Sequence, residues 1–464
     1  MKKQLLATTA LVGASLMVTG DALAQASPIQ MGVHGYFRTF FEVYSVPSNS
    51  DMVDAPRTGF GVPTYGTTQT MGKEKNNQVT IESRTYFQGE GKLDNGITPG
   101  VQVNFESLQR QYNAGGGGSP ISGVTIGNQV RRVQGYFKGA FGEFRGGDMD
   151  HAGRPRQTYG ALNNGILGAD SPSGAYPLGT NTTTPDLAGR AAKIQYTTPT
   201  FAGFDFAISY APSQSAGGAN ADGIQFEKQG VTNNAYGGKL DNSFDPSLRY
   251  VGTFGGFKVQ GDAAYVFTDN QCKGRTTAAS PNFNASCNPT FFNGNSASIS
   301  STTGGTTGDN DITNPWVHGS VQYMGFELGM GWSKVNNYVG NGLNSEVIAP
   351  GLSYSTGPWT FGAQYSHGEY DSIRAPLVTG PTGTALVGTQ VAGSTPSKST
   401  DKLDMVTANV SYLLGPGVTL HAGYAYEKYN YGANAAYRNA NDAGYSSIGS
   451  QTAHVVIGGF TFSY

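Results

Sequence analysis

Four arginines occupy polar positions in short segments where polar and apolar residues alternate. They are Arg38, Arg84, Arg132 and Arg145, with Lys138 nearby. A guanidinium group is permanently charged, and its planar array of donors matches carboxylates and phosphates. Arginines gathered on one surface attract anions and create an electric field in the space that they face. These residue types therefore indicate electrostatic chemistry, although each arginine can equally be solvated or be paired with Glu42, Glu82 or Glu106.

A second group of charges lies in or beside one long segment, at about residues 149–189, that is rich in turn-forming residues. The group contains the acids Asp148, Asp150 and Asp170 and the bases His151, Arg154 and Arg156. Carboxylates set against arginines across a narrow aqueous slot orient polar solutes and ions and impede apolar ones. Because both signs occur in the segment, its charge does not predict a preference for cations or for anions.

No catalytic constellation accompanies these charges. The histidines in predicted strands, His34, His318, His421 and His454, lack the paired spacing of metal ligands. The glycine run at 115–118 is not followed by the lysine and helix of a phosphate loop, and no nucleophile motif occurs. We therefore predict that the chain is not an enzyme and needs no cofactor or metal.

The two cysteines, Cys272 and Cys287, lie in a stretch rich in Ser, Thr, Asn and Gly, with 14 residues between them. In an exported protein this arrangement predicts a loop disulfide. Closing a loop of that size contributes about 3 kcal/mol in the chain-entropy model.

The segments that carry the charged residues have the two-residue period of β-strands. In the stretch "VQVNFESL", for example, Val101, Val103 and Phe105 alternate with polar residues, and "FDFAISY", "FELGMGW" and "WTFGAQYS" repeat the pattern. The composition agrees, since the chain has 68 Gly, 26 Tyr and 24 Phe but only 13% charged residues, against about 25% in typical globular domains. Together these features predict an all-β protein.

Short and long connections alternate along the chain. The seven short ones are "DNG" at 94–96, "GAFG" at 139–142, "PTFAG" at 199–203, "TFGG" at 253–256, "MG" at 324–325, "TGP" at 356–358 and "LGPG" at 414–417. The eight long ones lie near 46–76, 111–127, 149–189, 212–236, 269–311, 338–344, 372–400 and 431–450. Fifteen connections predict sixteen strands, and pairing the first strand with the aromatic last strand, "VVIGGFTFSY", removes both edges of the sheet.

The predicted first strand shows which face meets water. Val33, Gly35, Phe37, Phe41 and Val43 form an apolar row, whereas His34, Tyr36, Arg38 and Glu42 form a polar row that Phe40 interrupts. A ring of sixteen strands is too wide for side chains to fill, so the polar row can face a water-filled lumen. A secreted soluble sandwich would also alternate. The uneven connections, the uncharged apolar rows and the aromatic end favour a transmembrane barrel with lipid outside.

The amino-terminal residues have the three-part pattern of a secretory signal peptide. Two lysines precede an apolar run, and "DALAQA" offers cleavage after Ala24 or Ala26. We predict a signal peptide at residues 1–24 and one barrel domain at residues 25–464. Removing Lys2, Lys3 and Asp21 takes the formal charge from −2 to −3, which argues against nucleic-acid binding.

Four stretches give the mature chain a specific resemblance. The stretches "VHGYFR", "VQGYFKGAFGEFRGGDMD", "KIQYTTPTFAGFDFAISY" and "GGFTFSY" resemble those of the general porins of Gram-negative outer membranes, especially the alphaproteobacterial type. The resemblance implies a homotrimer, short periplasmic turns, long extracellular loops and a third loop, at about 149–189, folded into the lumen. It also implies wall arginines facing loop carboxylates, and assembly machinery that reads the terminal strand. That strand usually ends in Phe, whereas here it ends in Tyr464.

The sequence therefore predicts an outer-membrane porin through which small hydrophilic solutes and ions diffuse passively. Two alternatives stay open. The first is a sugar- or phosphate-selective channel, for which Tyr36, Tyr86 and Tyr136 would form an inward-facing aromatic ladder. The second is a non-conducting adhesin or structural barrel. Pore radius, ion preference, natural solute and gating cannot be predicted from the sequence.

Overall fold

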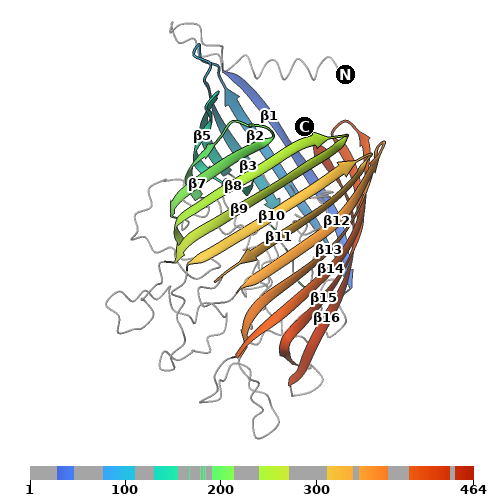
Figure 1. Ribbon diagram of the computed structural model, residues 1–464. Helices are drawn as coiled ribbons and strands as arrows, with labels where there is room; N and C mark the ends of the chain where they lie inside the picture. Colours follow the sequence, from blue (N-terminus) through green and yellow to red (C-terminus); the bar gives the residue numbers. More distant parts are fainter. Residues whose placement is uncertain are drawn as a thin grey trace, which may run out of the picture.

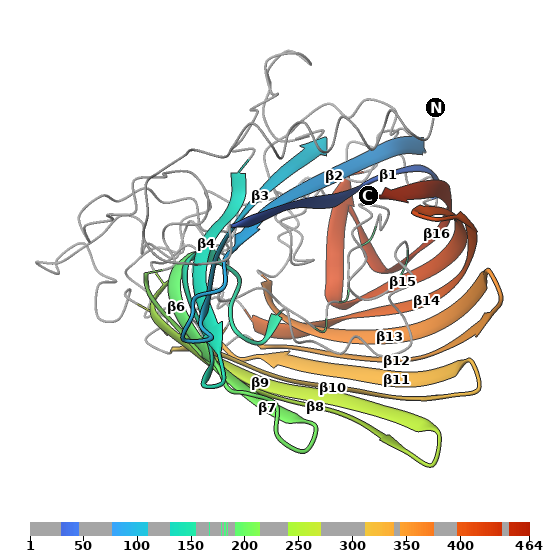
Figure 2. The same ribbon diagram turned by 90° about the horizontal axis from the view of Figure 1, so that it is seen from above.

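The computed structural model describes residues 29–45, 77–109, 130–154, 191–213, 240–270, 311–337, 344–374, 397–438 and 445–464, together with Leu167, Leu178, Asn181 and Thr183. The described residues form sixteen antiparallel strands that close into one barrel (Figures 1 and 2). Each strand pairs with its neighbours in sequence, and β1 pairs with β16. The strands are β1 (Gln30–Ser45), β2 (Asn77–Glu90), β3 (Thr98–Gln109), β4 (Val130–Gly139), β5 (Gly142–Met149), β6 (Ala191–Thr197), β7 (Phe204–Ser213), β8 (Leu240–Phe254), β9 (Phe257–Asn270), β10 (Ile312–Tyr323), β11 (Phe326–Val335), β12 (Ser345–Thr356), β13 (Trp359–Arg374), β14 (Ser397–Gly415), β15 (Val418–Arg438) and β16 (Tyr445–Ser463). The predicted sixteen-strand barrel is confirmed, and the described residues contain no helix long and apolar enough to cross a membrane.

All seven predicted short turns join consecutive strands. Glycine is needed in the turn between β4 and β5, because Gly142 has a φ of +102° and an added Cβ would lie 2.2 Å from the carbonyl oxygen of Thr197. The turn between β14 and β15 has a similar requirement at Gly417, where φ is +75° and a Cβ would lie 2.3 Å from the Ser463 oxygen. Residues that carry a side chain rarely adopt such φ angles, so these glycines determine where the hairpins turn.

The strands alternate as predicted between an outer apolar row and an inner polar row. In β1, Phe41 is 54% exposed, whereas the neighbouring Glu42 is fully buried. In β13 the outer row runs from Trp359 through Phe361 to Tyr365 and then becomes polar, with His367 followed by Glu369. This change indicates where the hydrocarbon band ends on the loop side of the barrel.

Aromatic pairs line the outer face beside the short turns. The rings of Phe257 and Tyr323 lie 4.2 Å apart, and those of Phe326 and Tyr354 lie 4.3 Å apart. Similar pairs occur at Phe204 with Tyr250 and at Trp359 with Tyr412. Rings at this level form the aromatic girdle of a barrel at the membrane–water interface.

The last strand closes the barrel through its final residue. The amide of Tyr464 donates to the Gly35 oxygen at 3.0 Å, and the Gly35 amide donates to the Tyr464 oxygen at 2.9 Å. The Tyr464 hydroxyl also lies 2.7 Å from the Thr85 hydroxyl of β2. These bonds satisfy backbone groups that would otherwise face lipid.

Two details of the strands differ from the predictions. The long connection expected at 431–450 is much shorter, because β15 continues to Arg438 and β16 begins at Tyr445. The strands stay paired there across a bulge near Asn430, since beyond the bilayer strand pairing no longer requires an apolar outer row. In addition, Pro350 cannot donate a backbone hydrogen bond to a ladder, so the sequence predicts that the strand either starts after it or has a bulge there. This prediction is wrong, because β12 runs through Pro350 with no bulge. Pairing with β11 is continuous at Pro350, and only the ladder to β13 is interrupted.

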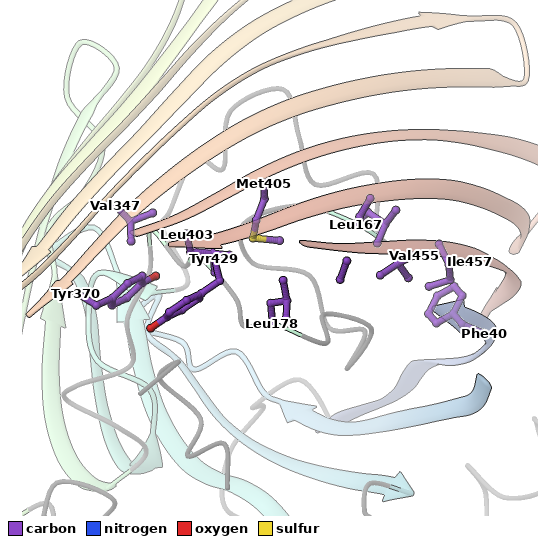
Figure 3. Packing of buried hydrophobic residues seen from close by; sticks show 12 residues of the cluster. Phe40, Leu167, Leu178, Val347, Tyr370, Leu403, Met405, Tyr429, Val455 and Ile457 are labelled. Carbon is purple, nitrogen blue, oxygen red and sulfur yellow. The ribbon is translucent and has the colours of Figure 1, made fainter. Parts of the chain in front are cut away.

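A small apolar core lies on the inner face of the barrel, where the alternation predicts polar residues. Figure 3 shows Val455 and Ile457 of β16, together with Phe40 of β1, close to Leu167. Leu403, Met405 and Tyr429, from β14 and β15, extend the cluster to Leu178. Since Leu167 and Leu178 belong to the segment after β5, this core joins that segment to the wall formed by β14, β15 and β16.

Candidate functional site

The first charged group of the inner wall is centred on Glu82 of β2. Its carboxylate accepts a hydrogen bond from Arg38 Nε at 2.6 Å and pairs with the Arg84 guanidinium at 2.8 Å. The Tyr36 hydroxyl donates to the other carboxylate oxygen at 2.7 Å, and both guanidinium groups lie over the Tyr36 ring, at 4.9 and 5.6 Å. The Glu82 carboxylate thus binds two guanidinium groups at once, and Arg84 lies across the ladder from Glu106 of β3.

A second charged group lies on the inner wall nearer the short turns. Glu90 of β2 pairs with Lys138 of β4 and accepts a hydrogen bond from the Tyr136 hydroxyl. Arg145 of β5 pairs with Glu143 of the same strand and lies 5.6 Å from the centre of the Tyr136 ring. The two acids balance the two bases, so this group is formally neutral.

A third group connects the wall to the start of the long segment after β5. Asp150 pairs with Arg132 of β4, and Arg154 Nε lies 4.0 Å from the same carboxylate oxygen. The Asp150 side chain is only 7% exposed, so its charge is held close to both bases. Like the first group, this one combines two guanidinium groups with one carboxylate.

Ala152 attaches the start of the segment to the inner side chains of β7 and β8. Its amide donates to Asp245 Oδ1 of β8 at 2.7 Å and to the Ser209 hydroxyl of β7 at 3.3 Å. Ser209 in turn donates to Asp245 Oδ2 at 2.6 Å. All three residues are buried, so the chain leaves β5 along the inner face of β7 and β8.

Further along the segment, single residues contact inner side chains of β10 and β13–β15. The Leu178 amide donates to Glu427 Oε2 at 2.8 Å, and the Asn181 amide group donates to the Leu403 oxygen at 2.9 Å. The Tyr370 hydroxyl donates to Asn181 Oδ1 at 2.8 Å. The Thr183 carbonyl oxygen lies 3.1 Å from His318 Nε2. Leu178, Asn181 and Thr183 thus contact the part of the barrel wall formed by β10 and β13–β15.

The predicted site residues fall into three classes. Arg38, Arg84, Arg132 and Arg145 lie on inner rows of β1, β2, β4 and β5, and Asp150, His151 and Arg154 lie where the segment begins. Asp148 was expected in the loop, but it lies in β5, where its partners Val133 and Ala192 belong to outer rows. The strand alternation continues to Met149, so Asp148 belongs to the strand and not to the loop. Arg156, Asp170, Cys272 and Cys287 lie outside the described residues, as does the Glu106 side chain.

The structure adds inner residues that the sequence did not single out. Arg249 of β8 pairs with Asp205 of β7 at 2.8 Å, and His318 of β10 lies 3.0 Å from Asp262 of β9. Trp316 is fully buried and lies edge-on to the His151 ring, with 5.0 Å between ring centres. The first two pairs join adjacent strands, and a pair of this kind becomes visible only when the register of the ladder is known.

The chain is similar to one protein family and to several solved structures. A family model described as Gram-negative porin matches residues 7–432. The anion-selective porin from Comamonas acidovorans has 14% sequence identity and a TM-score of 0.48, covering 94% of this chain and 100% of that one. OmpT of Vibrio cholerae, described as a trimer form, has 14% identity and a TM-score of 0.46, covering 94% and 99%. A mutant of the Rh. blastica porin has 12% identity and a TM-score of 0.45, covering 94% and 100%. No curated protein matches the chain.

Proposed function

The chain belongs to the Gram-negative porin family and forms an outer-membrane channel, and from this premise we propose how the channel selects its solutes. Small hydrophilic solutes and ions pass by diffusion, with no chemical step and no cofactor. They cross a constriction between the arginines of β1–β5 and the segment that follows β5. The observation that supports this proposal is the gathering of Arg38 and Arg84 around the Glu82 carboxylate on the inner wall.

The contacts between the barrel wall and the segment after β5 support the position of the constriction. The first described residues after β5 pair with Arg132 and contact β7 and β8, whereas Leu167 and Leu178 pack against β14–β16. The described residues of the segment are therefore attached to two different parts of the wall. Water-filled space narrowed in this way focuses the field of the wall charges on a passing ion.

A channel specific for sugars receives less support from the inner tyrosines. The ring of Tyr136 is only 5% exposed, and those of Tyr36 and Tyr136 are both covered by cationic side chains. The Tyr86 ring stacks on His34, with centres 5.0 Å apart and planes 4° from parallel. A sugar needs open aromatic faces along its path, so these contacts favour general diffusion.

We also propose a homotrimer that associates through the outer face of β1–β5. This face carries small residues, including Gly35, Ser83, Gly135 and Gly146. Small side chains let neighbouring backbones approach closely within a membrane. Light scattering of the protein in detergent, corrected for bound detergent, would give a mass of three chains. Assembly machinery that reads the strand ending at Tyr464 remains a further prediction from the resemblance.

Reconstitution in planar bilayers tests the proposed function. Discrete current steps that rise linearly with salt concentration are expected of general diffusion. A current that saturates and is blocked by one sugar would favour the selective channel. If purified, folded protein gave no ion current, the diffusion proposal would be wrong and a structural or adhesive role would replace it.

A further inference from the structure

Five neighbouring strands, β11–β15 (Figure 1), have outer rows that become charged at a common level near their loop ends. The six charged residues, which we call the outer charged band, are Lys334, Glu346, Glu369, Lys402, Asp404 and Lys428. The first four, one on each of β11–β14, face one another in turn across the ladders. Asp404 faces Lys428 one step nearer the short turns. The register therefore joins the six charges into one continuous surface.

Aromatic side chains fix the level of this band in the membrane. Trp332 Nε1 donates to Glu346 Oε1 at 2.9 Å. The Tyr365 hydroxyl donates to Asp404 Oδ1 at 2.7 Å. On the side toward the short turns the outer rows are apolar, as at Val406, which is 48% exposed. Tryptophan and tyrosine with one polar end take this position at a membrane–water interface. The outer charged band therefore lies at the level of the lipid headgroups.

The lysines of β14 and β15 are accessible and only partly neutralised. The Lys402 side chain is 49% exposed and lies 2.7 Å from Glu369, which is itself 44% exposed. Lys428 is exposed and forms no ion pair with any described residue. The carboxylate that faces it, Asp404, lies 2.7 Å from His367 Nδ1 instead. Lys428 thus presents its ammonium group at headgroup level, beside a carboxylate that is already engaged.

The two lysines can reach a single anion. Lys428 faces Asp404, and Lys402 is the next residue of the same outer row, so the two lysines are diagonal neighbours. Such neighbours lie about 7–8 Å apart, within reach of long side chains, and each ammonium group has three donors. We propose that Lys402 and Lys428 bind the phosphate of an anionic lipid headgroup. A zwitterionic headgroup carries a cation of its own, which these lysines would repel.

The surroundings of the two lysines favour a lipid over a protein or a soluble anion. The outer rows next to them are apolar at Val406 and Tyr424, which are 48% and 42% exposed, so acyl chains can lie directly below the bound phosphate. The band also lies on β11–β15, away from the face of β1–β5 through which we propose that subunits associate. This inference goes beyond the proposed channel activity and can be tested without measuring current.

Fluorescence quenching by brominated lipids can report which lipid occupies this surface. The chain has three tryptophans, of which Trp316 is fully buried. The variant Tyr426→Trp/Trp332→Phe/Trp359→Phe places a reporter two residues from Lys428, about 7 Å along β15. The variant Trp332→Phe keeps Trp359, beside the short turns, as a matched reporter at the opposite interface. Full-length protein is placed in phosphatidylcholine vesicles with increasing fractions of brominated phosphatidic acid or brominated phosphatidylcholine.

The Tyr426→Trp reporter is expected to show a roughly tenfold preference for phosphatidic acid. A lysine near an anionic lipid surface favours binding about fivefold, and Lys402 contributes less than this because it is shared with Glu369. Adding Lys402→Gln/Lys428→Gln should remove most of the preference. Lys402→Arg/Lys428→Arg should keep it, since guanidinium groups also bind phosphate. Lys334→Gln removes a more distant lysine of the same band and should have little effect.

The same measurements can overturn the proposal. A preference that survives Lys402→Gln/Lys428→Gln, or that changes equally at the Trp359 reporter, would show that these lysines do not form the site. Absence of quenching by either lipid at the Tyr426→Trp reporter would show that protein covers this face. Inorganic phosphate, compared with chloride at equal ionic strength, should leave the preference unchanged. If it abolished the preference, the lysines would bind free phosphate and the lipid assignment would be wrong.

Discussion

Neutralising Arg38 and Arg84 should make the potential that an ion meets at the inner wall more negative. The double variant Arg38→Gln/Arg84→Gln removes two positive charges from beside the Glu82 carboxylate. In water, one unit charge at ~6 Å changes the energy of a monovalent ion by about 0.7 kcal/mol. A change of two charges therefore gives about 1.4 kcal/mol, which salt at about 0.1 M reduces to roughly half. Because cations gain what anions lose, the ratio of cation to anion permeability should rise roughly tenfold.

The assay is the reversal potential across a bilayer that separates two salt concentrations. The charge-preserving variant Arg38→Lys/Arg84→Lys should keep the wild-type reversal potential. Lys402→Gln removes one positive charge from the outer row of β14 and should also have no effect. Glu82→Gln should shift the potential in the opposite direction to the double variant. If the double variant conducts with an unchanged reversal potential, these arginines do not belong to the selective part of the pore.

Three further changes test how the barrel and its inner segment are held together. Leu167→Ala removes a side chain that is 1% exposed and should cost about 2–5 kcal/mol of packing, seen as faster cleavage of the folded barrel by protease. Gly142→Val forces a side chain onto a φ of +102° and should cost at least ~1–3 kcal/mol, lowering the urea midpoint of unfolding, whereas Gly415→Ala, with open space around its Cβ, should not. Tyr464→Phe loses only the bond to Thr85 and should cost about 0.5–1.5 kcal/mol, measured by the same unfolding curve.

The barrel could be predicted from the sequence because its constraint is simple and repeated. Lipid requires an apolar outer row and a closed ladder, so each strand carries the same alternation and each hairpin its own turn residues. Gly142 and Gly417, for example, mark turns whose angles suit few other residues. The prediction was wrong at Pro350 and at the ends of β15 and β16. At Pro350, β12 stays paired with β11 although its ladder to β13 is interrupted. At the ends of β15 and β16, the strands stay paired beyond the bilayer without the usual alternation of polar and apolar residues.

The charged site could be predicted only in part. Alternation was enough to place Arg38, Arg84, Arg132 and Arg145 on the inner face. The partner of each charge depends on cross-strand register, and the sequence does not state the register directly. The shared Glu82, with Tyr36 donating to it, follows from the pairing of Arg38 with Glu82 and of Tyr36 with Arg84 across β1 and β2. Asp148 was misplaced because the end of β5 lies one residue inside the segment that composition assigns to the loop.

Apolar residues interrupt the alternation at some inner-row positions for a physical reason. These interruptions say more about the structure than the regular pattern does. Phe40, Val455 and Ile457 lie on inner rows, where a water-filled lumen would leave apolar side chains hydrated at a cost of about 25 cal/mol per Å². They are nevertheless buried, because Leu167 and Leu178 cover the inner face there. An apolar residue on a lumen-facing row therefore marks a place where another part of the chain must lie against the wall. By the same reasoning, Trp316 on the inner row of β10 marks the wall position beside which His151 and Thr183 dock.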